Sequence, residues 1–385
     1  MDKPIYLDYN GTTPVDSEVT KVIRLFIEDE FGNPSSSHFY GIEPKRAIMN
    51  ARRQVASLLG CKDSEIIFTS GGTESNNLAI LGILGDRDFS GKKIITSAIE
   101  HPAILEPLKH LEALGLIVDY LKVDEFGCVD PSDVESCIDE NTILITIMHS
   151  NNEVGSIQPI KEIGIIARAN QIPFHTDASQ SVGKVQCMVD ELGVDMLTVA
   201  GHKLYAPKGV GALYVRQGVE LRNLLYGAGQ EGGRRPGTEN VCGIVGLGKA
   251  CEIAQKDLQR NLVKIGKLRD RFKKSLMEKI SDLKLNGHPQ RSLPNTLNIS
   301  FKGVEANRIL EEIGLEVAAS SGAACHSDHI EISYVLDAMK VPIEYAKGAL
   351  RFSLGKFNTE QEIDHAANVV YQAVNKLRNL DDQSK

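Results

Sequence analysis

Met196-Leu-Thr-Val-Ala-Gly-His-Lys-Leu-Tyr-Ala-Pro-Lys-Gly-Val-Gly211 is the stretch of this sequence that says most about the fold. Its first five residues are mostly apolar and predict a strand, which delivers Gly201-His202-Lys203 at its carboxyl end. Open α/β sheets bind their ligands at that edge. Partial burial there would lower the pKa of Lys203 and make its amine a nucleophile toward an aldehyde. Judged alone, a surface lysine after a strand is the better interpretation.

Apolar runs of strand length alternate with amphipathic runs of helix length through the first two thirds of the chain. We predict strands at Ile66–Thr69, Lys93–Ser97, Ile143–Met148, Pro173–Asp177, Met196–Ala200 and Val210–Val215. Helices are predicted between them at Glu74–Leu84, Ala103–Leu114 and Ile160–Ala169. This alternation is typical of an α/β protein with a mostly parallel sheet that helices cover on both faces.

The pattern changes near Gly237, where a long helix is predicted from about Gly243 to Ile280. Its polar face is rich in charged residues, and we interpret it as a connector between domains. Beyond it, a smaller α+β domain is predicted from strands Thr296–Phe301 and Ala349–Leu354, helix Ala306–Ile313 and a last helix from Thr359. We place the large domain at residues 15–255, and the small one at residues 1–14 and 256–385.

Composition excludes several classes of protein. The chain has 385 residues, with 43 Lys+Arg against 51 Asp+Glu, and a net charge of −8 argues against direct binding of nucleic acid. Neither a basic leader nor a long apolar run precedes Ile5-Tyr6-Leu7, so we expect neither secretion nor membrane insertion. Seven cysteines without a C-x-x-C pair fit neither a disulfide framework nor a zinc cage, and they indicate a reducing, cytoplasmic location. No metal site is expected.

Other polar residues follow predicted strands. If a ligand with a pyridine ring lies at this edge, Asp177 would hold the ring nitrogen protonated. A cap on the following helix is an equally good interpretation of Asp177. Ser70-Gly-Gly-Thr-Glu-Ser-Asn76 opens a helix, and Gly72 and Thr73 there suit a phosphate cup without being a Walker loop. His101 and Asn152 also follow strands, and each taken singly is better explained as a capping or loop residue.

Together these residues resemble one family, the cysteine desulfurases. These are pyridoxal-phosphate (PLP) enzymes of fold type I, the aspartate-aminotransferase type. The motifs that carry the resemblance are Leu7-Asp-Tyr-Asn-Gly-Thr-Thr-Pro14, Phe31-Gly-Asn-Pro-Ser35, Phe68-Thr-Ser-Gly-Gly-Thr-Glu-Ser-Asn76, Glu100-His101, Met148-His-Ser-Asn-Asn-Glu-Val-Gly155, His175-Thr-Asp-Ala-Ser-Gln-Ser-Val-Gly-Lys184, Gly201-His-Lys203, Arg235-Pro-Gly-Thr238, Ser320-Ser-Gly-Ala-Ala-Cys325 and Leu350-Arg-Phe-Ser353. They cover nearly the whole chain in order.

The resemblance implies a role for each matching residue. Lys203 is similar to the lysine that forms a Schiff base with PLP, Asp177 to the partner of the pyridine nitrogen, and His101 to the residue that stacks on the ring and moves protons. The implied phosphate ligands are Gly72, Thr73, His202 and, from the partner subunit of a homodimer, Thr238. Asn152 and Gln180 resemble the contacts of the phenolic oxygen, and Asn152 and Arg351 those of the substrate carboxylate.

Cys325 is implied to be the residue that accepts sulfur from L-cysteine as a persulfide. Its surroundings, Ser320-Ser-Gly-Ala-Ala-Cys-His-Ser-Asp328, are small and polar, which predicts a mobile loop. His326 and His329 are candidates for generating the thiolate. The persulfide would pass to an acceptor protein, either an iron–sulfur scaffold or a thiolation enzyme.

Three alternatives stay open. Selenocysteine lyase shares the fold, the cofactor and nearly every motif, and residue types do not separate the two activities. A non-catalytic dimer of the same fold is disfavoured by the presence of Lys203, Asp177 and Cys325, and a plain aminotransferase is disfavoured by Cys325 alone. The chain departs from many relatives at Ala200, where they carry a serine that binds the phosphate, and in its short tail of 34 residues after Arg351, which puts docking of a scaffold in doubt.

Overall fold

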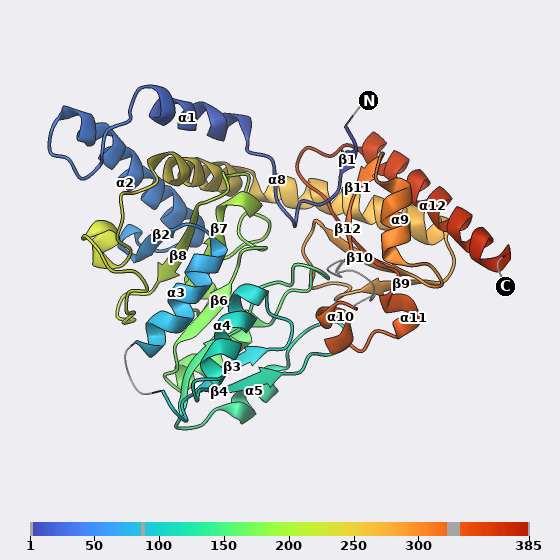
Figure 1. The fold of residues 1–385 in the computed structure, drawn as a ribbon, viewed down its shortest axis with the longest axis horizontal. Coiled ribbons are helices and arrows are strands. Elements are labelled where there is room, and N and C mark those ends of the chain that lie inside the picture. Colours follow the sequence, from blue (N-terminus) through green and yellow to red (C-terminus); the bar gives the residue numbers. More distant parts are fainter. Residues whose placement is uncertain (1–2, 86–88, 322–331, 384–385) are drawn as a thin grey trace.

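A computed structural model describes residues 3–85, 89–321 and 332–383, and Figure 1 shows its α/β fold. A sheet of seven strands, in the order β2-β8-β7-β6-β5-β3-β4, forms the larger part. The strands are β2 (Ile66–Thr69), β3 (Lys93–Ser97), β4 (Ile117–Leu121), β5 (Thr142–Thr146), β6 (Phe174–Asp177), β7 (Met196–Ala200) and β8 (Gly211–Val215). Only β8 runs against the others, so the prediction of a mostly parallel sheet is confirmed.

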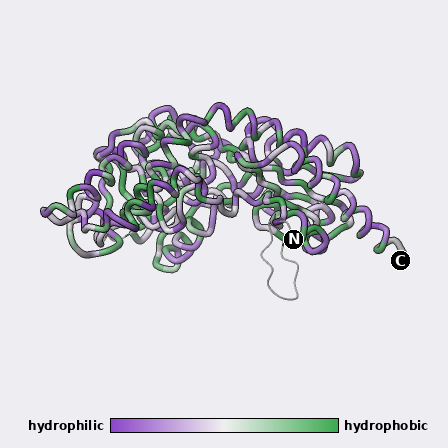
Figure 2. Tube along the Cα trace, turned by 90° about the horizontal axis from the view of Figure 1, so that it is seen from above, coloured by the Kyte–Doolittle hydropathy of each residue, from purple (hydrophilic) through white to green (hydrophobic). Residues whose placement is uncertain are grey.

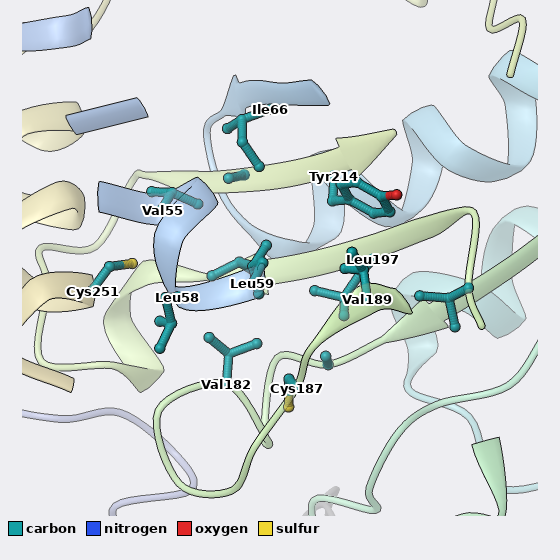
Figure 3. Packing of buried hydrophobic residues seen from close by; sticks show 14 of the residues in the cluster. Val55, Leu58, Leu59, Ile66, Val182, Cys187, Val189, Leu197, Tyr214 and Cys251 are labelled. Carbon is teal, nitrogen blue, oxygen red and sulfur yellow. The ribbon is translucent and has the colours of Figure 1, made fainter. Parts of the chain in front are cut away.

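Helices cover both faces of this sheet. On one face lie α3 (Gly72–Leu84) and α4 (Pro102–Glu112), and on the other α2 (Phe39–Leu59), α6 (Ile160–Ala169) and part of α8 (Val241–Lys279). Successive side chains along each strand point to opposite faces of the sheet. Ile66 and Phe68 therefore pack under α2, while Ile67 between them packs under α3. Figure 3 shows the α2 side, where Val55 and Leu59 face Leu197 and Tyr214 of the sheet.

Helix α8 joins two hydrophobic cores, which fits its interpretation as a connector. Its first half buries Ile244, Leu247 and Cys251 against the large sheet. Its second half buries Leu268 and Phe272 in a separate core. The expected domain boundaries at residues 14/15 and 255/256 stay a prediction.

The second core belongs to a smaller antiparallel sheet, in the order β12-β13-β10-β9. Its strands are β9 (Leu283–Asn286), β10 (Thr296–Phe301), β12 (Ser320–Ser321) and β13 (Ala349–Ser353), with helices α9 (Ala306–Ile313) and α12 (Glu360–Gln383) on it. At the start of the chain, β1 (Ile5–Tyr6) pairs with β11 (Val317–Ala318). The smaller α+β part is therefore confirmed, and it includes the first strand of the chain. Seen from above, the smaller part forms one side of an elongated molecule, with the C-terminus at its outer end and the N-terminus closer to the middle (Figure 2).

The remaining elements are short, apart from the amphipathic helix α1 (Ser17–Glu28) near the start of the chain. The short ones are α5 (Pro131–Cys137), α7 (Val189–Leu192), α10 (Tyr334–Ala338), α11 (Ile343–Ala346) and the 3-10 turns η1 (Asp63–Glu65), η2 (Gly201–Lys203) and η3 (Gln230–Gly233). Among the described helices, none combines the length and the apolar character needed to cross a membrane. The six cysteines in the described part of the chain are free thiols, three of them buried.

Candidate active site

A cavity of about 320 Å³ opens at the carboxyl ends of β6 and β7 and the start of α3. Nine residues named from the sequence line it: Gly72, Thr73, His101, Asn152, Asp177, Gln180, His202, Lys203 and Arg351. They come from segments between residues 72 and 351, and the fold brings them to one edge of the large sheet. The expected position at the carboxyl ends of the strands is therefore observed.

Lys203 reaches the cavity because β7, buried along its whole length, ends at Ala200, and the turn η2 that follows ends at Lys203. Its Nζ donates hydrogen bonds to the backbone carbonyls of Asn10 and Gly11, the latter at 2.8 Å. Burial and, to a lesser extent, the charge of Arg351 lower the pKa of this amine to about 8, although Asp8 and Asp177 act in the opposite direction. A substantial fraction of the amine is therefore neutral, and so nucleophilic, near physiological pH.

Asp177 ends β6 with its carboxylate held from two sides. Oδ2 accepts a hydrogen bond of 2.7 Å from Nδ2 of Asn76, and Oδ1 accepts one of 2.9 Å from the backbone N–H of Ser179. The helix-cap interpretation is wrong, because turns follow Asp177 and the next helix, α7, begins only at Val189. The carboxylate instead binds the backbone of the following turn and faces the cavity. A fixed carboxylate in this position suits a positively charged ring nitrogen.

His101 caps helix α4 and lines the same cavity. Its Nδ1 accepts a hydrogen bond of 3.0 Å from the backbone N–H of Ala103. Burial lowers its pKa, and nearby Lys203 lowers it too, although Asp177 raises it. The ring is therefore neutral at pH 7, with its proton on Nε2, and a neutral ring can stack on another flat group and exchange protons.

The amino end of α3 forms an anion cup beside these groups. Gly71, at φ 152°, leads into Gly72, where a Cβ would lie 3.0 Å from Oγ of Ser179 and 3.3 Å from Cβ of Ala200. A side chain there would fill the narrow space where the free N–H groups of the first turn point. His202 borders the cup, and burial together with neighbouring lysines lowers its pKa to about 4. It therefore offers a neutral N–H donor.

Arg351, on β13, closes the cavity from the side of the small sheet. Its Nη1 donates to the backbone carbonyl of Asn152 at 3.1 Å and its Nη2 to Oδ1 of Asp8 at 2.7 Å. Within the part of the chain that the structure describes, Nε of Arg351 and Oδ1 of Asn152 are buried and have no hydrogen-bond partner. Buried polar atoms are rarely left unsatisfied, so these two indicate a place for a polar ligand.

Asn10 and Lys184 belong to the site although the sequence interpretation gave them no role. The backbone carbonyl of Asn10 accepts hydrogen bonds from Lys203 and Gln180, and its Oδ1 accepts one from Nζ of Lys184 at 3.1 Å. Lys184 also donates to Oε1 of Gln180 at 2.9 Å, and burial holds its pKa well below the usual value. Both residues lie in motifs that carry the family resemblance, and this position is the feature of the sequence that could have indicated their place in the site.

One residue named from the sequence lies away from this cavity, and another falls outside the described residues. Thr238 is exposed and does not line it, and its implied contact is with the partner subunit. Cys325, with His326 and His329, lies outside the described residues.

The described residues on both sides of Cys325 are attached near the cavity. Before it, Ser320 pairs with Arg351 across the small sheet. After it, Oγ of Ser333 donates to Oε2 of Glu153 at 2.5 Å, and the hydroxyl of Tyr334 donates to the carbonyl of Glu100 at 2.7 Å.

The set of side chains fits PLP better than a metal. An amine, a carboxylate and an anion cup correspond to the aldehyde, the ring nitrogen and the phosphate of that cofactor. Within the described ranges, no three His, Cys, Asp or Glu side chains gather in a way that would hold a metal ion.

Comparisons with known proteins agree with this geometry. The aminotransferase class-V family model matches residues 5–365. A curated relative, the cysteine desulfurase IscS of Dictyoglomus turgidum, is 48% identical over 381 residues, which are 99% of this chain and 97% of the relative. The solved structure of a NifS-like protein has a TM-score of 0.90 at 38% identity, covering 97% of this chain and 100% of that one. The structure of SspA in complex with cysteine has a TM-score of 0.81 at 37% identity, with 93% and 100% covered.

Proposed function

The chain belongs to the cysteine desulfurases of the aminotransferase class-V family, and from that premise we propose that it takes sulfur from L-cysteine and leaves L-alanine. The observation that carries this proposal is the cavity itself. A partly neutral lysine amine, a fixed carboxylate and an anion cup lie there beside two unsatisfied polar atoms of Arg351 and Asn152. An α-amino acid can place its amine at the Lys203 end of such a site and its carboxylate at the Arg351 end.

PLP is the proposed cofactor, because the residues of the cavity fit its three polar ends. Lys203 would hold the aldehyde, Asp177 the ring nitrogen, and Gly72, Thr73 and His202 the phosphate, with His101 against the ring. Asn152 and Gln180 would lie at the phenolic oxygen. When bound, PLP supplies an electron-withdrawing ring that makes the Cα proton of an attached amino acid acidic.

The protein's own residues then bind the substrate and move protons. Arg351, with Asn152, binds the carboxylate of cysteine and fixes the orientation of its Cα–H bond. Lys203, whose pKa is lowered to about 8, is poised to take up that proton and return it. His101 is neutral and is the second group placed to exchange a proton with the substrate.

Cys325 is the proposed sulfur acceptor. Its thiolate attacks the substrate sulfur, so that an S–S bond forms while the substrate Cβ–S bond breaks. The electron pair of the broken bond stays on the carbon skeleton, which takes up a proton and leaves as alanine. The attachment of Ser320, Ser333 and Tyr334 beside the cavity supports this role, because these residues flank the segment that carries Cys325.

We further propose a cytoplasmic homodimer in which Thr238 of one subunit completes the phosphate site of the other. An exposed apolar surface on and beside the start of α2 supports a subunit contact, with Phe31 72%, Phe39 80% and Ile42 58% exposed. The persulfide would pass to an acceptor protein, an iron–sulfur scaffold or a thiolation enzyme.

The direct test is product formation by the purified protein with PLP and a reductant. L-Cysteine should give alanine and sulfide in equal amounts, and Lys203→Ala should abolish both. Lys208→Ala, which changes an exposed lysine five residues along the chain, is the matched control and should be fully active. Turnover of selenocysteine with none of cysteine would instead identify a selenocysteine lyase. Full activity of Lys203→Ala would contradict the assignment of the site.

A further inference from the structure

We propose that Asp8 is the resting counter-ion of Arg351, and that the carboxylate of the substrate takes its place. This inference rests on the proposed function, because it assumes that Arg351 binds the substrate. It makes Asp8 a residue that determines specificity, although Asp8 belongs to the first turn of the chain and lies 343 residues before its partner.

The ion pair between Asp8 and Arg351 is held in a fixed place. Asp8 forms a backbone bridge with Ser353, two residues after Arg351 on the same strand. Oδ1 of Asp8 lies 2.7 Å from Nη2 of Arg351, and the two side chains are 27% and 11% exposed. A pair this sheltered from water keeps more of its attraction than an exposed one.

The contacts of the guanidinium show why the substrate must compete with Asp8. A carboxylate binds arginine in a fork through Nη2 together with either Nε or Nη1, so every fork includes Nη2. Asp8 holds Nη2, and the carbonyl of Asn152 holds Nη1. Among the residues at 3–85, 89–321 and 332–383, none bonds to Nε, so the edge formed by Nε and Nη2 is the place for a ligand, and Asp8 occupies half of that edge.

A second observation shows that the position of the Asp8 carboxylate is built into the site. Gly11 lines the cavity, and a Cβ on Gly11 would lie only 2.4 Å from Oδ2 of Asp8. The missing side chain at Gly11 therefore leaves the room that the carboxylate of Asp8 occupies at the cavity wall.

The substrate carboxylate displaces Asp8 from Arg351 because of their charges. Two carboxylates on one guanidinium repel each other, and Asp8 retains enough exposure to turn toward water when the substrate arrives. In the resting site, Asp8 cancels the charge of Arg351 and so weakens the binding of simple anions. Only a ligand that is also anchored through its amine, as an α-amino acid is, then displaces Asp8 effectively.

The test compares two ligands that differ only in the carboxylate. The PLP-loaded protein is titrated with L-alanine and with ethylamine, and binding is followed by the cofactor's absorbance. Asp8→Asn should tighten L-alanine by about tenfold relative to ethylamine, because a charge that competes with the carboxylate is lost, and the ethylamine titration reports any effect of that charge on Lys203. Gly11→Ala, whose Cβ displaces the carboxylate without removing it, should change alanine binding in the same direction.

Asp16→Asn is the matched control, because Asp16 is also paired, with Lys356, but lies off the cavity. Asparagine replaces aspartate well at the helix cap that Asp16 forms, so alanine binding should not change. Unchanged or weaker alanine binding by both Asp8→Asn and Gly11→Ala would overturn this inference but would leave the proposed function standing. Failure of the unmodified protein to bind alanine would overturn the proposed function as well.

Discussion

Nδ2 of Asn76 donates a hydrogen bond of 2.7 Å to Oδ2 of Asp177, and both side chains are buried. Asn76 lies on the second turn of α3, and Asp177 ends the strand β6. This contact links the helix that forms the anion cup to the carboxylate proposed to bind the ring nitrogen. This hydrogen bond therefore joins the two ends of the proposed cofactor site directly, in addition to the packing of α3 on the sheet.

Asn76→Ala should lower kcat/KM for cysteine at least tenfold. A hydrogen bond to a charged group contributes about 1.5–3 kcal/mol, and without it the Asp177 carboxylate keeps only its bond to the backbone N–H of Ser179 and is held less firmly toward the ring. Steady-state kinetics with saturating PLP measures the effect. Asn77→Ala is the control, because its amide only bonds to the carbonyl of Thr73 on its own helix, and it should stay close to full activity. Equal losses in the two variants would contradict this role of Asn76.

Lys203 should react with amine reagents at a lower pH than an ordinary lysine. Burial destabilises its charged form, so the amine loses its proton with a pKa of about 8 instead of about 10.4. In the PLP-free protein, the rate of acetylation of Lys203, followed by peptide mass spectrometry, should rise with pH and level off above about pH 9. A rate that keeps rising to pH 11 would show that the amine is not perturbed.

Arg351→Lys should raise KM for cysteine and lower kcat/KM by about tenfold or more. Lysine keeps the positive charge but loses the planar fork, at a cost of roughly 1.5–3 kcal/mol. Arg216→Lys, at a surface ion pair with Asp190 on the large domain, is the control and should leave the kinetics unchanged. Wild-type kinetics in Arg351→Lys would mean that the carboxylate binds elsewhere.

Ala200→Ser should make the protein retain PLP more firmly. Ala200 lines the cavity beside Gly72, so a hydroxyl there would reach the anion cup. One added hydrogen bond of about 1 kcal/mol slows cofactor release roughly fivefold. Release is measured by the loss of absorbance during dilution with a PLP trap. Ser179→Ala should have the opposite effect, because Ser179 lines the same wall and is the residue placed to compensate for Ala200.

The large sheet was predictable because its central strands are buried on both faces and read as short apolar runs. Strand β4 was missed: it lies at the edge of the sheet, and Ile117-Val-Asp-Tyr-Leu121 is largely only half-buried. Helix α2 was missed as well. It contains Pro44 near its start and exposes large apolar residues such as Phe39, which weakens the helical pattern.

The site was predictable where side-chain chemistry carries the signal. Lys203, Asp177, His101 and Arg351 are residue types suited to the chemistry, and the structure brings them together. The role of Asn10 depends on its backbone carbonyl, which no residue type encodes. The pairing of Asp8 with Arg351 joins the two ends of the chain, so neither spacing nor a local pattern predicts it.

The transfer of sulfur to Cys325 is the central claim, and a single-turnover reaction with L-cysteine tests it most directly. Alanine is quantified, and the persulfide is located by mass spectrometry after peptide mapping without reductant. The account predicts one alanine and one persulfide on Cys325 per active site, with neither formed by Cys325→Ser, although this variant still binds PLP and cysteine. Cys61→Ser is the control, since burial raises the pKa of the Cys61 thiol to about 12 and makes it unreactive. A full yield of alanine from Cys325→Ser, or sulfur on another cysteine, would contradict the account.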